Sequence, residues 1–235
     1  MSGRLHPILA GVLALAACGE PTPTEVQEPE PTGQEPLLIP LVEDNVRDDT
    51  LVIQVTFDLE DGTHLLVAGN QQETFEGLRL YHYRARPDST MEVLARSSPG
   101  YDSWTMLPTC FRPGPGDDLL LLANFGERQS WGQKVMRLGP EGFTDLGFLD
   151  VAVPEREVLP DTTLLKLGNA GAVARVAGSW DDLRITFTGD SLFLYDDLRG
   201  SVDRTLASDR VTYRLREGRV FLIVDGEERE VEPPA

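Results

Sequence analysis

Alternation of apolar and polar residues with a period of two is the feature that most restricts the fold of this chain. In "RVTYRLREGRVFLIVDG", Val211, Tyr213 and Leu215 fall on one side, and the polar residues between them fall on the other. This spacing is typical of a half-buried β-strand. Glu217-Gly218 then supplies a two-residue turn, so the segment predicts a β-hairpin over residues 211–224.

The same pattern recurs in two other segments. Leu183, Ile185 and Phe187 alternate before a turn at Gly189-Asp190, and "VIQVTFDLEDGTHLLVAG" turns at Asp61-Gly62. No segment of ten or more residues shows the 3.6-residue apolar period of an amphipathic helix. The sequence therefore predicts an all-β fold of antiparallel meander sheets, in a small propeller-like arrangement or a β-sandwich.

A weak internal repeat lies in the first half of the chain. "LLVAGNQQETFEGLRLYHYR" and "LLLLANFGERQSWGQKVMRL" align at an offset of 55 residues, which places Ala68 on Ala123. Internal repetition on this scale indicates a repeated supersecondary unit. We expect two copies of a strand-turn-strand-strand unit, over residues 51–98 and 104–151.

An acidic turn precedes each of the aligned segments, at Asp61-Gly62 and at Gly116-Asp117-Asp118. The second copy, residues 116–147, faintly resembles the FG-GAP type of β-propeller repeat, although it lacks the calcium-binding Asp-x-Asp-x-Asp-Gly of that repeat. The resemblance implies successive propeller blades. A twisted sandwich of antiparallel sheets accounts for the same alternation.

The N-terminus has the layout of an export signal. Arg4 supplies positive charge, and Ile8 to Ala17 form an uncharged apolar run. A helix needs about 20 residues to cross a bilayer core, so this run predicts a signal-peptide core and no membrane span. Leu15-Ala16-Ala17-Cys18 resembles the lipobox of bacterial lipoproteins. The resemblance implies that residues 1–17 are removed and that Cys18 carries diacylglycerol and an amide-linked acyl chain such as palmitate.

Several acyl chains on one residue hold a protein stably on a membrane. The residue after the cysteine is Gly19 and not the aspartate that favours inner-membrane retention in this family. The resemblance therefore implies a periplasm-facing lipoprotein of the cell outer membrane. The alternative is an ordinary secretory signal cut near Ala17, with Cys18 an incidental thiol.

Residues 19–36 contain five prolines, five glutamates and no aromatic residue. Such a stretch buries too little apolar surface to offset its ordering entropy, and proline and like charges extend it. At about 3.1 Å per residue it could reach roughly 55 Å. We expect residues 18–40 to form a lipidated, disordered tether and residues 41–235 to form a single β-rich domain.

The sequence contains no known catalytic or cofactor-binding motif. His64 and His82 match no metal-ligand spacing, and the chain has no G-x-S-x-G elbow and no phosphate-binding glycine loop. If Cys18 is acylated, Cys110 has no partner, and we expect a small buried apolar residue. No catalytic residue, metal or cofactor is predicted. The net charge of −18 disfavours nucleic acid as a partner because phosphates would be repelled.

Acidic pairs and tryptophans are the remaining candidates. The pairs are Glu60-Asp61, Asp117-Asp118, Asp181-Asp182 and Asp196-Asp197. They suit solvated turns, but paired carboxylates can also hydrolyse glycosides or hold calcium. Trp104, Trp131 and Trp180 lie in loop-like sequence, where each could contact a ligand or partner or plug an end of the β core.

These features predict a lipid-anchored envelope protein that works as a non-catalytic binding or scaffolding module. Its partner would be a protein or glycan of the envelope, and the oligomeric state is left open. The alternative is a lipid-anchored hydrolase that cuts cell-wall or extracellular polysaccharide through the paired carboxylates.

Overall fold

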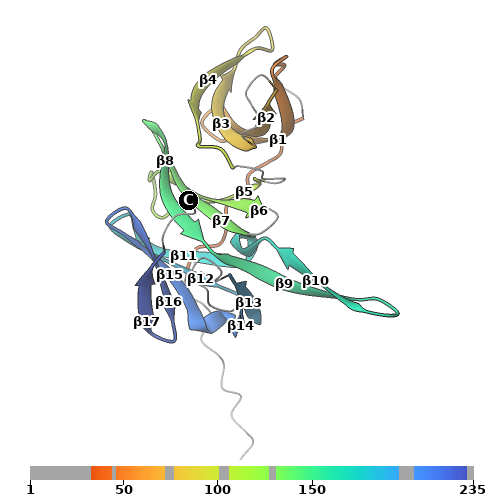
Figure 1. Ribbon diagram of the computed structural model, residues 1–235. Coiled ribbons are helices and arrows are strands. Elements are labelled where there is room, and N and C mark those ends of the chain that lie inside the picture. Colours follow the sequence, from red (N-terminus) through yellow and green to blue (C-terminus); the bar gives the residue numbers. More distant parts are fainter. Residues whose placement is uncertain are drawn as a thin grey trace, which may run out of the picture. The chain divides into compact units, whose positions relative to one another are not determined.

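The computed structural model describes residues 33–43, 46–71, 77–100, 106–126, 131–195 and 204–231, all within one compact unit that spans residues 31–235 (Figure 1). The predicted signal peptide, Cys18, Trp104 and the Asp196-Asp197 pair lie outside the described residues.

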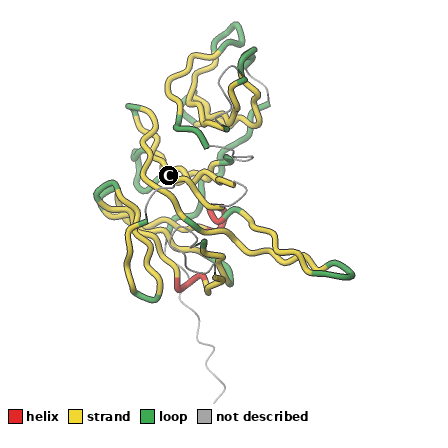
Figure 2. Tube along the Cα trace, viewed as in Figure 1, coloured by secondary structure: helices red, strands yellow, loops and turns green. Residues whose placement is uncertain are grey.

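The regular structure is almost entirely strand (Figure 2). In the described ranges the helical elements are two short 3-10 turns, η1 (Ala170–Val173) and η3 (Ser208–Arg210). The described residues contain seventeen strands in four sheets, and every pairing between these strands is antiparallel. The all-β prediction is confirmed, and the sheets are compatible with both of the arrangements expected for them.

The first two sheets are four-stranded meanders in chain order. The first sheet contains β1 (Leu51–Leu59), β2 (Thr63–Asn70), β3 (Leu78–Ala85) and β4 (Met91–Arg96). The second sheet contains β5 (Pro108–Phe111), β6 (Leu119–Gly126), β7 (Trp131–Gly139) and β8 (Gly142–Leu149). The first sheet lies within residues 51–98 and the second within residues 104–151. Ala68 and Ala123 are both fully buried in the second strand of their sheet.

The remaining strands form two interleaved sheets. The third sheet has the order β11 (Ala174–Ser179), β12 (Asp182–Phe187), β15 (Val211–Arg216), β16 (Arg219–Val224), β17 (Glu227–Glu230). The fourth has the order β10 (Thr163–Gly168), β9 (Val151–Val158), β13 (Ser191–Leu194), β14 (Arg204–Ala207). The chain therefore leaves the third sheet after β12 and returns to it at β15.

This topology corrects one expectation. Gly189-Asp190 does not close a hairpin, because β12 pairs with β15 while β13 pairs with β9 and β14. Leu183 and Ile185 lie opposite Leu215 and Tyr213, and all four are buried in one core. The apolar side chains of β12 are therefore buried beside β15, a strand distant in sequence, and β12 does not pair with the neighbouring β13. The short turn at Gly189-Asp190 links two different sheets.

The hairpin over residues 211–224 is confirmed. Arg216 pairs with Arg219, so Glu217 and Gly218 form a two-residue loop. Both have positive φ, 53° and 71°, as a type I′ turn requires. Glycine adopts this backbone conformation without steric cost, whereas Glu217 does not. Val211, Tyr213 and Leu215 are buried on one face as the alternation predicts.

The second sheet is buried on both faces. On β6, Leu120 and Leu122 belong to a core shared with the third and fourth sheets, whereas Leu121 and Ala123 belong to a core shared with the first sheet. A strand with apolar neighbours on both sides needs no polar face. This explains the uninterrupted apolar run "LLLLA".

Residues 34–42, here called the strap, run along the outer strands of three sheets. Gln34 exchanges two backbone hydrogen bonds with Val176 of β11. The Leu37 N–H donates to the Cys110 carbonyl of β5, and the Val42 N–H donates to the Thr56 carbonyl of β1.

The position of the strap differs from the expectation for residues 33–40, whose composition suggested that they belong to the tether. Their side chains contribute little to the core, and Leu38 is 98% exposed. Backbone hydrogen bonds to strand edges supply order that composition alone does not show.

Candidate functional site

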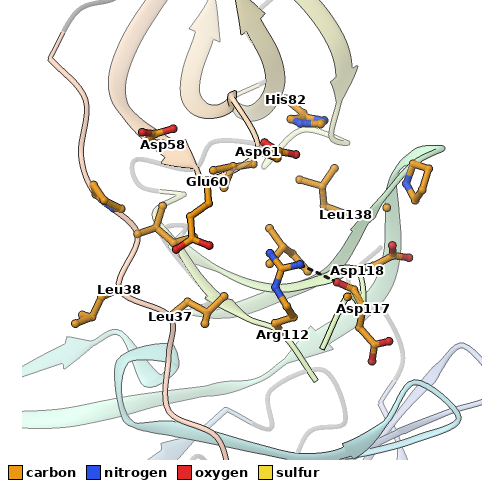
Figure 3. A pocket seen from close by; sticks show the side chains of 17 residues that line it. Leu37, Leu38, Asp58, Glu60, Asp61, His82, Arg112, Asp117, Asp118 and Leu138 are labelled. Carbon is orange, nitrogen blue, oxygen red and sulfur yellow. Dashed lines mark hydrogen bonds between the residues drawn. The ribbon is translucent and has the colours of Figure 1, made fainter. Parts of the chain in front are cut away.

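A hollow of about 580 Å³ lies where turns of the first and second sheets meet beside the strap (Figure 3). Five carboxylate residues line it: Asp58, Glu60, Asp61, Asp117 and Asp118. His82 and Arg112 are the other titratable residues of the lining. The hollow thus gathers more negative than positive side chains.

The two acidic turns of the hollow occupy equivalent places in the two sheets. Glu60-Asp61 lies between β1 and β2, and Asp117-Asp118 lies between β5 and β6. Each turn joins the first two strands of a four-stranded meander. The fold therefore brings together two of the four acidic pairs noted in the sequence, from positions that the internal alignment places side by side.

Asp61 is held by a local turn. Its Oδ1 accepts hydrogen bonds from the Thr63 backbone N–H at 2.9 Å and from Thr63 Oγ1 at 2.6 Å. Burial raises the pKa of Asp61. The hydrogen bonds from Thr63 and the positive charge of protonated His82 lower the pKa by more, so it lies below the ordinary value. Asp61 therefore carries negative charge at neutral pH.

His82 faces the same turn, with its Nε2 at 2.8 Å from Thr63 Oγ1. Burial lowers the pKa of His82, Arg84 lowers it further, and Asp61 only partly opposes this. The imidazole is therefore mainly neutral at pH 7. It does not cancel the charge of the carboxylates around it.

Asp118 is tied to the second sheet. Its Oδ2 accepts from Arg137 Nε and lies 2.6 Å from Arg137 Nη2. The same guanidinium lies over the Trp180 ring, 4.7 Å from its centroid. A charge-assisted pair of this kind orients the carboxylate. One carboxylate of the hollow is thus already neutralised.

Apolar side chains complete the wall of the hollow. They are Leu37, Leu38, Ile39, Leu59, Leu119 and Leu138, with two prolines at positions 40 and 140. Figure 3 shows Leu37 and Leu38 of the strap on one side and Leu138 of β7 on another. The site therefore suits a ligand that combines positive charge with an apolar part.

The predicted tryptophan contacts are only partly visible. Trp180 is half-buried and packs against the core shared by the second, third and fourth sheets. Its indole Nε1 is buried and has no hydrogen-bond partner among the described residues. This placement favours the alternative in which Trp180 plugs an end of the core. Trp131 begins β7, but its side chain lies outside the description, as does the whole of Trp104.

The two histidines lie on opposite faces of the first sheet. His64 pairs with Tyr83 and His82 with Leu65, so successive positions point the two rings apart. The rings of His64 and Tyr83 are tilted by 33° with their centroids 5.2 Å apart, and His64 Nδ1 lies 3.7 Å from Asp58 Oδ1. Across the described ranges, no group of three or more His, Cys, Asp or Glu residues could hold a metal ion.

The remaining candidates lie apart from the hollow. Cys110 is a buried free thiol, and burial raises its pKa to about 12, which leaves almost no nucleophilic thiolate at neutral pH. Asp182, at the turn between β11 and β12, is bound by two nitrogens of Arg214 at 2.5 and 2.6 Å. That contact lowers the pKa of Asp182.

Residue-by-residue reading of the sequence missed the convergence of the two acidic turns and the contribution of the strap. The signal for the first was present, because the 55-residue offset places Glu60-Asp61 on residues 115–116, directly before Asp117-Asp118. No comparable pattern marked Arg112 or the strap leucines.

Comparison with known proteins adds no relationship: no family model matches the chain, and no match was found among the curated proteins or the solved structures. In the part of the chain that the structure describes, no helix is long and apolar enough to cross a membrane.

Proposed function

We propose that this chain is a lipid-anchored protein of the bacterial cell envelope whose β-rich domain binds a positively charged protein segment in the acidic hollow. The observation that carries the proposal is the meeting of two equivalent acidic turns around one hollow of about 580 Å³. The lipobox-like sequence that ends at Cys18 supports the anchoring. No catalytic step is needed for this role.

The chemistry of the hollow selects the partner. Lysine and arginine side chains combine a cationic head with an apolar stem, which matches carboxylates set among leucines. Low-dielectric walls strengthen charge interactions relative to water. The net charge of −18 would also steer a basic partner toward the protein.

A charge-removal experiment tests this role. The double variant Glu60→Gln/Asp117→Asn should weaken binding of a lysine- and leucine-containing peptide by about three- to thirtyfold, since two partly exposed charge pairs contribute a few tenths to 1 kcal/mol each. Fluorescence anisotropy of a labelled peptide measures the change. Wild-type affinity should also fall as salt rises.

The matched control is Glu155→Gln/Glu157→Gln, which removes two charges from β9, outside the lining of the hollow. It should leave peptide affinity nearly unchanged. Equal weakening by both double variants would show that net charge, and not the hollow, controls binding.

A hydrolase remains the alternative, because paired carboxylates in one hollow are also what glycoside hydrolysis uses. Two features count against it. The pKa of Asp61 is lowered, whereas a general acid needs a raised one, and Asp118 is held by Arg137. Release of sugar fragments from cell-wall polysaccharide, abolished by Glu60→Gln or Asp117→Asn, would favour the hydrolase over the binding role.

A further inference from the structure

Several strand edges of this fold are protected, whereas the outer edge of β10 is open in the described part of the chain. The strap lies on the outer strands of three sheets, at β1, β5 and β11. The edge strand β17 is short and carries three glutamates. Charged and covered edges resist pairing with other chains. β10, with the sequence Thr-Leu-Leu-Lys-Leu-Gly, is the outer strand of the fourth sheet, has no covering segment among the described residues, and carries one charged side chain, Lys166, which pairs with Glu157 of β9 at 2.7 Å.

The outer half of the β9–β10 hairpin has no sheet around it. β9 pairs with β13 only at Val151 and Ala152, so residues 153–158 have β10 as their strand partner in the described chain (Figure 1). Three apolar side chains of this ribbon are exposed, Val158 at 80%, Leu164 at 44% and Leu165 at 49%. A two-stranded ribbon is only marginally stable alone, which makes added pairing favourable.

The register fixes which backbone groups of β10 point outward. Leu159 and Thr162 exchange both backbone hydrogen bonds at the end of the hairpin. In an antiparallel pair, every second residue points its N–H and C=O groups toward the neighbouring strand, and the residues between point theirs away. In the register of β9 and β10, the N–H and C=O groups of Thr163, Leu165 and Leu167 therefore point away from β9. On the opposite edge of the ribbon, the outward position next to Arg156 is Pro154, which has no N–H to donate.

We propose that β10 pairs antiparallel with β10 of a second copy of this chain, about a two-fold axis at Leu165. In this register Leu165 lies opposite its own equivalent, and Thr163 lies opposite Leu167. All outward groups of both strands then form hydrogen bonds. The exposed Leu165 side chains meet at the axis, where cross-strand apolar pairs stabilise a sheet.

Charge supports this register. Lys166, the sole charged residue of β10, would lie opposite Leu164 of the other copy, so the two lysines do not face one another. A membrane fits the hairpin less well, because Asp161 lies in its end loop and would enter the bilayer first, at high cost. Each chain has a net charge of −18, so added salt should strengthen the dimer by screening repulsion.

The dimer is tested with the full chain lacking its signal and carrying Cys18→Ser, by sedimentation velocity over a concentration series. Leu165→Pro removes one outward N–H and should raise the dimer dissociation constant about tenfold or more. Leu165→Ser keeps that N–H and should weaken the dimer less. The control Leu38→Ser removes a more exposed leucine from the strap and should change nothing.

A chain that stays monomeric at every concentration and salt would overturn the proposal, as would a dimer unaffected by Leu165→Pro. Binding of the monomer to phosphatidylcholine vesicles that Leu165→Pro abolishes would assign the edge to a membrane and also overturn it. The peptide-binding test of the hollow is independent, because its affinity falls with salt whereas dimerisation rises.

Cysteine crosslinking tests the register without relying on proline. In the Cys18→Ser background, Leu165→Cys should oxidise to a covalent dimer, because directly opposite residues of a hydrogen-bonded pair lie about 5.5 Å apart, within disulfide reach. The more exposed Val158→Cys on β9 is the control and should crosslink far less. Equal crosslinking of both variants would exclude the two-fold axis at Leu165.

Discussion

Burial sets the chemistry of the titratable side chains at the scale of single residues. It raises the pKa of Cys110 to about 12 and contributes most to the lowered pKa of His82. The apolar context of Cys110 was visible in the sequence, so its burial could be predicted. The opposite orientations of His64 and His82 could not, because they depend on the register between β2 and β3.

His82 gives a prediction for pH dependence. Its pKa is lower in the folded chain than the ordinary 6.5, so the unfolded chain binds the proton more readily. The stability linked to His82 is complete above pH 6.5 and is lost as pH falls below it. Urea unfolding at pH 7.5 and pH 5 should show a smaller loss of stability for His82→Gln than for wild type. Identical losses would mean that His82 does not titrate differently on folding.

At the scale of elements, the turns could be predicted from short sequence segments, but the pairing of strands distant in sequence could not. The hairpin at Glu217-Gly218 follows from two adjacent residues and the alternation beside them. The partner of β12 is β15, which lies beyond an inserted pair of strands, and nothing in a short window identifies it. The strap is a similar case, because its order comes from edges distant in sequence.

A proline pair tests the strap. Leu37→Pro removes the N–H that donates to the Cys110 carbonyl, and the loss should lower the free energy of unfolding by about 1–3 kcal/mol, since it leaves a buried acceptor without its partner. Leu38→Pro is the neighbouring control, and because Leu38 is exposed it should change stability by no more than about 0.5 kcal/mol. Chemical denaturation measures both. Equal destabilisation would mean that the strap bond contributes nothing specific.

At the scale of the whole molecule, the all-β class could be predicted from the sequence, while the hollow emerged only from the structure. The alternation of apolar and polar residues and the turn residues are local features of the sequence, and they are enough to predict the all-β fold class. The convergence of Glu60-Asp61 with Asp117-Asp118 depends on how the first and second sheets pack through the core that contains Leu121 and Met136. That packing depends on side-chain shape across two sheets, which a period in the sequence does not specify.

The proposed anchoring belongs to the same scale, since it would set where the whole protein works. Cys18→Ser should leave the chain unlabelled by a fatty-acid probe and uncleaved by the lipoprotein signal peptidase, because both steps require the thiol of that residue. Cys110→Ser removes the other cysteine and should be labelled like wild type. Acylation of Cys18→Ser at the wild-type level would refute the anchor.

The course of the strap has a mechanical consequence. A pull applied to the chain before residue 33 would reach the Gln34–Val176 bonds and the Glu35–Arg175 pair first, then the Leu37–Cys110 bond, and last the Val42–Thr56 bond. The strap would peel stepwise and would not rupture at once. Each step would uncover the edge of another sheet, first β11, then β5 and then β1, so tension on the N-terminal side would change which strands of the domain are open to pairing.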